Sequence, residues 1–259
     1  MSRESWKTEH VLVLVKAAPN WSTKYKKYEI CTAGINPEEG TWRRLFPFSE
    51  KLMLEKDVKV WDVIELETEK ATDDPRFESR KINGESIKTV DRVESQKARR
   101  EVIKRFVEGS LETALKQKRS LALIEPLIDD FKIDKGTREP LQFTMNGTPF
   151  RRNPYGDIRL VYRWRCRERC RFCLGKSHTS QCFDWGANWL YRKLLKTDDE
   201  KNAMIKVRNK LQYEMKYDNN TWFIMGTHRQ RPWKKWMIVG LLWMKKQEPS
   251  NIAPLANFL

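Results

Sequence analysis

The segment HVLVLVK, residues 10–16, holds five consecutive valine and leucine side chains, which is typical of a buried strand. VKVWDVIELE, residues 58–67, alternates apolar and polar positions and predicts a second strand. Between them, residues 36–40 (NPEEG) supply the turn residues of a hairpin loop. Five β segments in about 80 residues, with little helix, predict a small barrel over residues 8–90. The expected strands are residues 10–16, 25–33, 41–46, 58–67 and 77–87.

The rest of the chain mixes helix and strand. Residues 91–119 place apolar side chains at helical spacing in a charged background and predict a helical connector. Residues 120–259 are expected to form a second, basic β domain that contains one long helix over residues 198–217. A faint echo, Gly34 before WRR and Gly226 before WKK, favours two related barrels in tandem. We therefore expect an α+β chain, mainly β.

Composition excludes several classes of protein. The 259 residues are 39% hydrophobic and include 11 Trp and 11 Phe, enough for a sizeable core, so full disorder is excluded. A charged fraction of 33% and the lack of any long apolar run argue against a transmembrane protein. Residues 1–10 have no apolar core of a signal peptide, and five cysteines do not suit a disulfide framework. We expect a cytoplasmic protein with no membrane partner.

The net charge of +16 is concentrated near the C-terminus. Residues 151–259 hold 23 basic and 9 acidic side chains and seven of the 11 tryptophans, whereas residues 1–90 hold 16 of each sign. Basic groups displace counterions from phosphates and aromatic rings stack on bases, so this segment predicts binding of single-stranded nucleic acid. The alternative is a soluble basic domain whose tryptophans are core, which is the usual place of any single tryptophan.

The strongest local signal is a cluster of four cysteines and one histidine within residues 166–182. Zn²⁺ takes four thiolate or imidazole ligands, and a C-x2-C pair offers two from one tight turn. Cys170, Cys173, His178 and Cys182 have a spacing that resembles the retroviral zinc knuckle, one residue short in the last gap. His178 and Cys182 would share one face if a helix begins there, and Cys166 is the alternative fourth ligand. The cluster predicts a structural zinc site rather than a fortuitous group of thiols.

An arginine row leads into this cluster. If the segment is extended, alternation places the arginines on one face and the aromatic and thiol groups on the other. Successive arginines would lie about 6.5 Å apart, close to the spacing of phosphates in a single strand. Only Glu168 is locally present to neutralise them, so we expect phosphate contact rather than a salt-bridged face. The row is Arg163, Arg165, Arg167, Arg169 and Arg171.

Two further segments place a tryptophan beside cations on a predicted hairpin. The first is Trp42-Arg43-Arg44, and the second is the loop 228–235 between expected strands at 222–227 and 236–244. Stacking and ion pairing could grip a base and its phosphate there, or the tryptophan could plug the barrel. The candidates in the second loop are Arg229, Arg231, Trp233, Lys234 and Lys235.

We find no clear catalytic motif. Phosphate-binding glycine loops, H-E-x-x-H and G-x-S-x-G are absent from the sequence. Asp57 and Lys59 have the D-x-K spacing of metal-dependent nucleases but lack a carboxylate placed before them, and Asp184 is expected to cap a helix over 185–195. No catalytic residue is predicted.

The chain resembles the dual OB-containing domain proteins, a prokaryotic group found among genome-defence and repair genes. This resemblance implies two oligonucleotide-binding (OB) barrels, nucleic-acid binding, and partners among other proteins of a defence or repair system. The position of Cys182 is often apolar in the group, which favours Cys166 as ligand. The motifs are Cys31-Thr-Ala-Gly34-Ile, Trp42-Arg43-Arg44, Val63-Ile64, the Cys/His cluster leading to Asp184-Trp185, Gly226-Thr, and Trp236-Met-Ile-Val-Gly240-Leu.

The leading hypothesis is a zinc-stabilised, non-catalytic binder of single-stranded DNA or RNA that consists of two OB-like barrels, a helical connector and a zinc-knuckle insert. The first alternative is a metal-dependent nuclease or other nucleic-acid processing enzyme. The second is an adaptor whose basic face binds an acidic protein.

Overall fold

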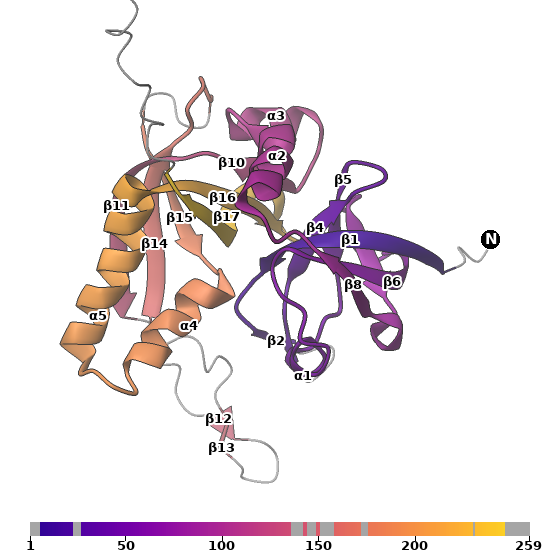
Figure 1. Cartoon of the computed structure of the whole chain (residues 1–259), viewed down its shortest axis with the longest axis horizontal. Helices are drawn as coiled ribbons and strands as arrows, with labels where there is room; N and C mark the ends of the chain where they lie inside the picture. Colours follow the sequence, from indigo (N-terminus) through magenta and orange to yellow (C-terminus); the bar gives the residue numbers. More distant parts are fainter. Residues whose placement is uncertain are drawn as a thin grey trace, which may run out of the picture.

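The computed structural model describes residues 6–22, 27–135, 142–143, 149–150, 158–171, 176–229 and 231–246. They form two β units that lie side by side, the N-terminal unit at the right of Figure 1 and the C-terminal unit at the left. A short helical segment lies between them at the top, and a second group of helices covers the outer side of the C-terminal unit. None of the helices in these ranges is long and apolar enough to cross a membrane.

The N-terminal unit is a closed barrel of five strands, which confirms the barrel predicted from the first 90 residues. The strands are β1 (Lys7–Lys16), β4 (Thr32–Asn36), β5 (Thr41–Leu45), β6 (Asp62–Lys70) and β7 (Ser79–Ile82). Their order is β1-β4-β5-β7-β6, and β6 pairs with β1 to close the ring. Only the β5–β7 pair of this ring is parallel. A further strand, β8 (Lys88–Arg92), pairs with β6.

Local sequence explains the barrel's turns. The β4–β5 loop ends at Gly40, whose φ of 65° suits glycine, and Asn36 Oδ1 accepts the amide of Glu39 at 2.9 Å. The predicted strand at 58–67 begins only at Asp62, because Trp61 at φ 78° turns the chain first. Gly34 lies so close to β1 that a Cβ would sit 2.0 Å from the carbonyl oxygen of Leu12.

Short elements complete the barrel and its connection to the second unit. The loop after β1 forms a small hairpin, and a capped helix follows β5; Ser49 accepts the Leu52 amide at its start. The expected connector is helical in two pieces separated by a short strand. These elements are β2 (Asn20–Ser22), β3 (Lys27–Glu29), α1 (Glu50–Glu55), η1 (Gly84–Ser86), α2 (Gln96–Phe106), β9 (Val107–Glu108) and α3 (Leu111–Lys116).

The C-terminal unit is a seven-stranded sheet that does not close, so the expectation of a second closed barrel is wrong. Its strands are β10 (Leu121–Ile124), β11 (Leu127–Lys135), β14 (Ile158–Arg165), β15 (His178–Cys182), β16 (Asn219–His228) and β17 (Arg231–Lys245), with β9 at one edge. The order is β11-β14-β15-β17-β16-β10-β9. A separate hairpin pairs β12 (Gln142–Phe143) with β13 (Pro149–Phe150).

The strand order of the two units is nevertheless alike. β10 and β11 are interrupted only by Glu125 and Pro126. If they are counted as one strand, the C-terminal unit has five main strands, whose neighbours in the sheet follow the order first, second, third, fifth, fourth and first again. The strands of the barrel follow the same order. In both units the third and fifth strands pair in parallel, β5 with β7 and β15 with β17. Pro126 has no amide hydrogen for a ladder, which explains why the strand breaks there.

Helices pack on the second sheet. The expected helix at 198–217 is found as α5 (Glu200–Arg208) followed by a π-helix, η2 (Asn209–Asp218), and Asp199 caps its start. Val207, Leu211 and Met215 are buried along one side, as the spacing predicted. α4 (Trp185–Leu194) begins at Asp184, whose carboxylate accepts the Ala187 amide at 2.8 Å, which confirms the predicted cap.

An apolar core between the units buries the outer face of two barrel strands. Ala33 and Ile35 of β4 and Trp42 of β5 are at most 4% exposed, and they belong to one cluster with Ile224 and Val239 of the β16–β17 hairpin. The outer surface of β4 and β5 is therefore covered by the C-terminal sheet.

Candidate metal site and pocket at the barrel mouth

Three residues of the predicted metal cluster come together. The ligand atoms of Cys166, Cys170 and His178 all lie within 4.8 Å of one another. His178 Nε2 is 3.5 Å from the Cys166 sulfur and 3.9 Å from the Cys170 sulfur. Neighbouring ligands around tetrahedral Zn²⁺ lie about 3.5–3.8 Å apart, given Zn–S and Zn–N bond lengths. The spacing of these donors therefore fits a metal ion.

The fold positions these donors from three directions. Cys166 follows the last residue of β14, and His178 opens β15 opposite Trp164, whose ring centroid is 4.6 Å from that of His178. Both cysteines are buried. Burial lowers the pKa of His178, which favours the neutral imidazole that a metal requires. Cys173, the other member of the C-x2-C pair, lies outside the described residues.

Cys182 is not part of this group. Residues 178–182 form a strand rather than the helical turn that would have placed Cys182 beside His178. Four residues of strand span about 13 Å. Burial, and then the carboxylate of Asp184, raise the pKa of the Cys182 thiol well above its ordinary value, so it stays protonated in the core. Of the two fourth ligands considered, Cys166 is the one that lies at the site.

Only the first two arginines of the row, Arg163 and Arg165, lie on a strand. β14 ends at Arg165, and the three later arginines lie in the loop that follows, although all five are exposed. Glu168 is not the only acid within reach, so that premise was wrong. Asp129 pairs with Arg165 at 3.0 Å, and Glu125 pairs with Arg167 at 2.7 Å. For these two arginines the salt-bridged face is the better description, and phosphate contact by Arg163, Arg169 and Arg171 stays a prediction.

The segment Trp42-Arg43-Arg44 is buried, so an exposed, base-gripping hairpin is wrong here. Trp42 belongs to the core between the units. Arg43 pairs with Glu9 at 2.7 Å and with Glu39 at 2.5 Å. Arg44 points the other way, toward the C-terminal unit, and only this residue of the three lines a cavity.

The second tryptophan hairpin is a confirmed strand pair, tighter than expected. β16 reaches His228 and β17 begins at Arg231, so residues 231–235 are strand rather than loop. Arg229 and Lys235 are exposed, and Arg229 pairs with Asp73 at 3.3 Å. The side chains of Arg231, Trp233 and Lys234 lie outside the described part of the structure.

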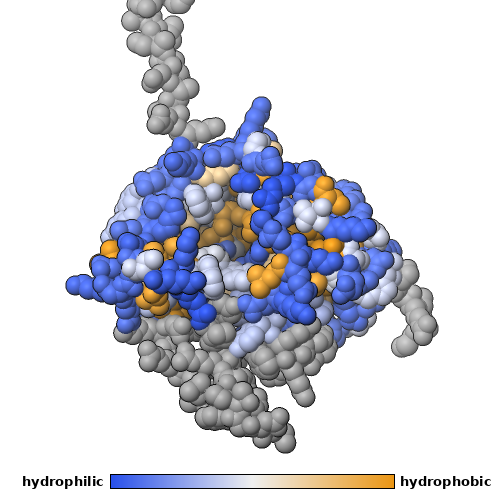
Figure 2. Space-filling view, turned by 60° about the horizontal axis from the view of Figure 1, so that its bottom comes forward, coloured by the Kyte–Doolittle hydropathy of each residue, from blue (hydrophilic) through white to orange (hydrophobic). Residues whose placement is uncertain are grey.

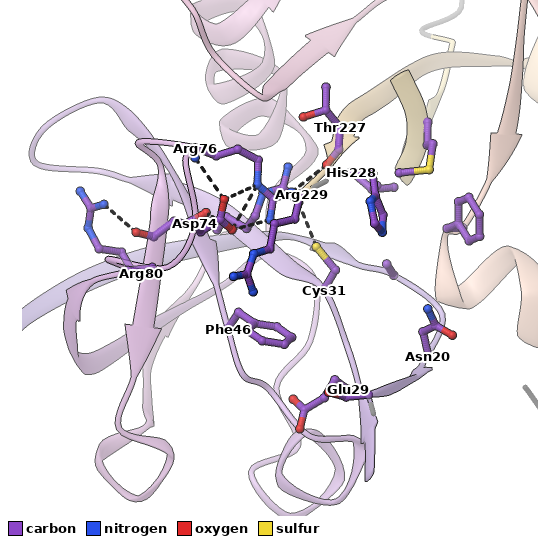
Figure 3. A pocket seen from close by; sticks show the side chains of 18 of the residues that line it. Asn20, Glu29, Cys31, Phe46, Asp74, Arg76, Arg80, Thr227, His228 and Arg229 are labelled. Atoms are coloured by element: carbon purple, nitrogen blue, oxygen red, sulfur yellow. Dashed lines mark hydrogen bonds and ion pairs between the residues drawn. The ribbon is translucent and has the colours of Figure 1, made fainter. Parts of the chain in front are cut away.

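A pocket of about 370 Å³ opens at the mouth of the barrel. The molecule is hollowed between its two units, with hydrophobic side chains in the hollow and hydrophilic ones around it (Figure 2). In Figure 3, Cys31 and Phe46 of the barrel lie beside Arg76 and Arg229. The other lining residues are Ala17, Ala18, Asn20, Ser22, Glu29, Arg44, Ala71, Asp73, Asp74, Ser79, Arg80, Lys81, Phe183, Thr227, His228, Met237 and Val239.

A buried polar network forms one wall of this pocket. Arg44 donates to the Cys31 sulfur at 3.0 Å and to the Ser120 carbonyl at 3.2 Å. Ser120 in turn donates its amide and hydroxyl to Glu78, which is fully buried. Burial lowers the pKa of Arg44, but a guanidinium remains charged in proteins. The network thus fixes the Arg44 guanidinium beside the pocket, with the Glu78 carboxylate on the other side of Ser120.

A second arginine ties the pocket to the hairpin. Arg76 is held by Asp74 in a bidentate pair, with contacts of 2.9 and 2.6 Å, and donates to the Thr227 carbonyl at 2.7 Å. Among the buried atoms of the described residues, Arg44 Nε and Thr227 Oγ1 have no hydrogen-bond partner. An unsatisfied buried donor is costly, so the wall retains hydrogen-bonding capacity beside the pocket.

Comparison with protein families divides the chain in two. A model described as domain of unknown function DUF8758 matches residues 7–105, and one described as domain of unknown function DUF8757 matches residues 109–257. The chain belongs to the DUF8757 family. No curated protein matches it. The DUF8757 segment holds the open sheet and the Cys/His group, and the DUF8758 segment holds the barrel.

The pocket takes its walls from both matched segments. Cys31, Arg44 and Arg76 belong to the DUF8758 part, and Phe183 and Thr227 belong to the DUF8757 part. Of the predicted nucleic-acid-binding residues, Arg44 and Arg229 line this pocket. Sequence reasoning did not bring them together with the other lining residues, because these are scattered between positions 17 and 239 and form no compact motif.

Asp184 lies at the junction between the units and is partly buried. Its carboxylate caps α4 and also accepts the amide of Leu241 on β17 at 3.1 Å, while its backbone bridges to Ala17. Burial raises the pKa of Asp184 to about 6, in spite of these hydrogen bonds and the nearby Lys16. By contrast, Asp57 of the D-x-K spacing is exposed and pairs with Lys59 at 2.6 Å, as a surface ion pair would.

Proposed function

We propose that this protein binds single-stranded nucleic acid at the mouth of its N-terminal barrel, and that a zinc ion stabilises its C-terminal unit. The observation that carries the proposal is the position of the pocket. It lies between the loop from the first to the second barrel strand, residues 17–31, and the loop from the fourth to the fifth, residues 71–78. OB barrels bind oligonucleotides with these two loops and the face of strands two and three.

The chemistry of the pocket supports a nucleotide ligand. Five basic and three acidic side chains line it, so guanidinium and ammonium groups are available for phosphate. Phe46 and Phe183 offer aromatic surface for a base. The strand order of the barrel, with its single parallel pair between the third and fifth strands, is consistent with an OB-like barrel.

Zinc is the metal that best suits two cysteine sulfurs and one imidazole at these distances. Cys166, Cys170 and His178 would hold it, and Cys173 is the fourth ligand by its C-x2-C spacing. A fully ligated ion leaves no open position, so its chemistry would be structural. These residues would fix the arginine-rich loop between β14 and β15 against the sheet.

The test is a fluorescence anisotropy titration of the full chain with labelled single- and double-stranded oligonucleotides of equal length over a salt series. We expect preference for the single strand and a log–log salt slope near −0.7 for each phosphate contacted. Absence of binding to either form at low salt would contradict the proposal and favour the acidic-protein adaptor. Cleavage of the probe on addition of Mg²⁺ would favour the nuclease alternative.

Two arginines provide a matched pair of variants. Arg229 lies at the pocket and pairs with Asp73, whereas Arg159 on β14 pairs with Asp134 away from it. Their side chains are similarly exposed, 44% and 53%. Arg229→Ala is expected to weaken binding and flatten the salt slope by about one phosphate contact, and Arg159→Ala is expected to leave both unchanged. Equal effects would mean that binding follows net charge alone.

A further inference from the structure

The packing of the two units restricts how a strand can approach the barrel. The face of β4 and β5, the second and third barrel strands, is where an OB barrel lays out an oligonucleotide. Here Ala33, Ile35 and Trp42 on that face are buried against the β16–β17 hairpin. Among the described residues, a nucleic acid therefore cannot run across these strands at Ala33, Ile35 and Trp42, and the pocket lies at the end of this face beside Arg44.

The C-terminal unit forms one side of the pocket. Thr227, Met237 and Val239 of the hairpin line it there and face the loop residues of the barrel. A strand that crossed this surface would have to leave through the packed interface between the units. The shape suits a ligand that enters by one end, and the volume of about 370 Å³ lies within the range of small-molecule pockets.

The polar groups of the pocket suit a phosphate with several free oxygens. Arg44 is 3% exposed and Thr227 is 2% exposed, and each has a buried donor without a partner. A terminal phosphate carries about −1.5 to −2 charges and three acceptor oxygens, whereas a phosphodiester within a strand carries one charge. The arginines that line the pocket suit the more highly charged terminal group better.

We propose that the pocket binds one nucleotide through a terminal phosphate, so that the protein holds the phosphorylated end of a strand rather than an internal run of bases. Arg44 and Thr227 would receive the phosphate, and Phe46 and Phe183 would flank the base. This inference rests on the proposed function. The same chemistry is carried by a free nucleoside monophosphate, which the experiment separates from a strand end.

The experiment compares linear oligonucleotides bearing a 5′-phosphate, a 3′-phosphate or hydroxyl ends with a circle of the same sequence, each bound to the full chain. One phosphorylated linear form is expected to bind about 10–100-fold more tightly than the hydroxyl form and the circle, the range for hydrogen bonds to a charged group. A nucleoside monophosphate is then added as competitor. Displacement at the affinity of the strand end would identify the free nucleotide as the ligand.

The outcomes separate the two proposals. Equal binding of circle and linear forms would overturn end recognition and leave nucleic-acid binding intact. Binding of the monophosphate but of no oligonucleotide would overturn the proposed function and support a nucleotide site in the pocket. Absence of binding by every probe would overturn both the proposed function and end recognition. Ala18→Trp, which places a large side chain on the pocket lining, is expected to abolish the preference for the phosphate, while Arg159→Ala retains it. Thermal unfolding checks that each variant is folded.

Discussion

Asp184 gives the fold a stability that depends on pH. Burial raises the pKa of this carboxyl from an ordinary value of 3.8 to about 6. Because the folded state binds the proton more tightly than the unfolded chain, this group is most favourable below pH 4 and becomes less favourable as the pH rises to 6. The shift corresponds to about 3 kcal/mol of unfolding free energy lost across that window. Above pH 6 the loss is complete.

Replacement by asparagine isolates this contribution. In Asp184→Asn the side-chain oxygen can still cap α4, but the amide nitrogen would meet the Leu241 amide and lose that hydrogen bond. The loss of this hydrogen bond is the same at every pH, so it lowers the free energy of unfolding of the variant by a constant amount and does not change its dependence on pH. The free energies of unfolding of both proteins are measured by urea titration from pH 4 to pH 7.

The wild-type value minus the variant value is expected to fall by about 2.4 kcal/mol over that range, because the unfolded chain has already begun to lose its proton at pH 4. Groups other than Asp184 contribute equally to both proteins and cancel in the difference. A difference that is flat, or that rises with pH, would refute the reasoning, because it would mean that the buried carboxyl keeps an ordinary or lowered pKa.

Three other perturbations test separate parts of the structure. Cys170→Ser is expected to remove bound metal and lower the melting temperature by several degrees, as measured by elemental analysis and calorimetry, while Cys31→Ser retains a full equivalent. Gly34→Ala is expected to lower the free energy of unfolding in urea by more than about 2 kcal/mol, because its Cβ would meet the Leu12 backbone. In Gly109→Ala the Cβ would meet the flexible Glu168 side chain, so the loss should be smaller. Equal losses in the two variants would contradict this reasoning. Arg43→Ala is expected to cost about 2–3 kcal/mol, because it removes the cation beside Glu9 but leaves Glu9 its hydrogen bonds from Asn36 and Thr68. Because it lies away from the pocket, this variant should bind oligonucleotides normally once folded, and weaker binding would count against its purely structural role.

The barrel was predictable because its strands carry strong local signals. The unbroken valine and leucine run in β1 and the turn residues before Gly40 need no distant partner to be recognised. The open second sheet was not predictable, since it depends on a break at Pro126 that looks like an ordinary strand boundary in the sequence. The Gly34 and Gly226 echo pointed to a repeat for the wrong reason, because Gly34 lies in the second barrel strand and Gly226 in a strand equivalent to the fourth.

The candidate sites show the same division between local and distant information. Clustering alone identified Cys166, Cys170 and His178, but only the strand at 178–182 decides against Cys182. For Trp42 and Arg44, alternation correctly implies a shared face, yet nothing in their neighbourhood says that this face is covered by residues some 180 positions later. The alternation of residues along a strand shows which side chains share a face, but it does not show which other part of the chain packs against that face.

Arg44 and Arg76 link the two matched segments by hydrogen bonds, in addition to the covalent connection of the chain. Arg44 donates to Ser120 and Arg76 to Thr227, so each arginine of the barrel completes its hydrogen bonding on the other unit. Neither segment could form the pocket alone. The isolated barrel would expose an apolar face and leave the guanidinium groups of Arg44 and Arg76 without their partners on the other unit, and the isolated sheet would lack the barrel loops. In this chain the two segments therefore act as one structural unit, because separating them would remove both the pocket and the apolar interface.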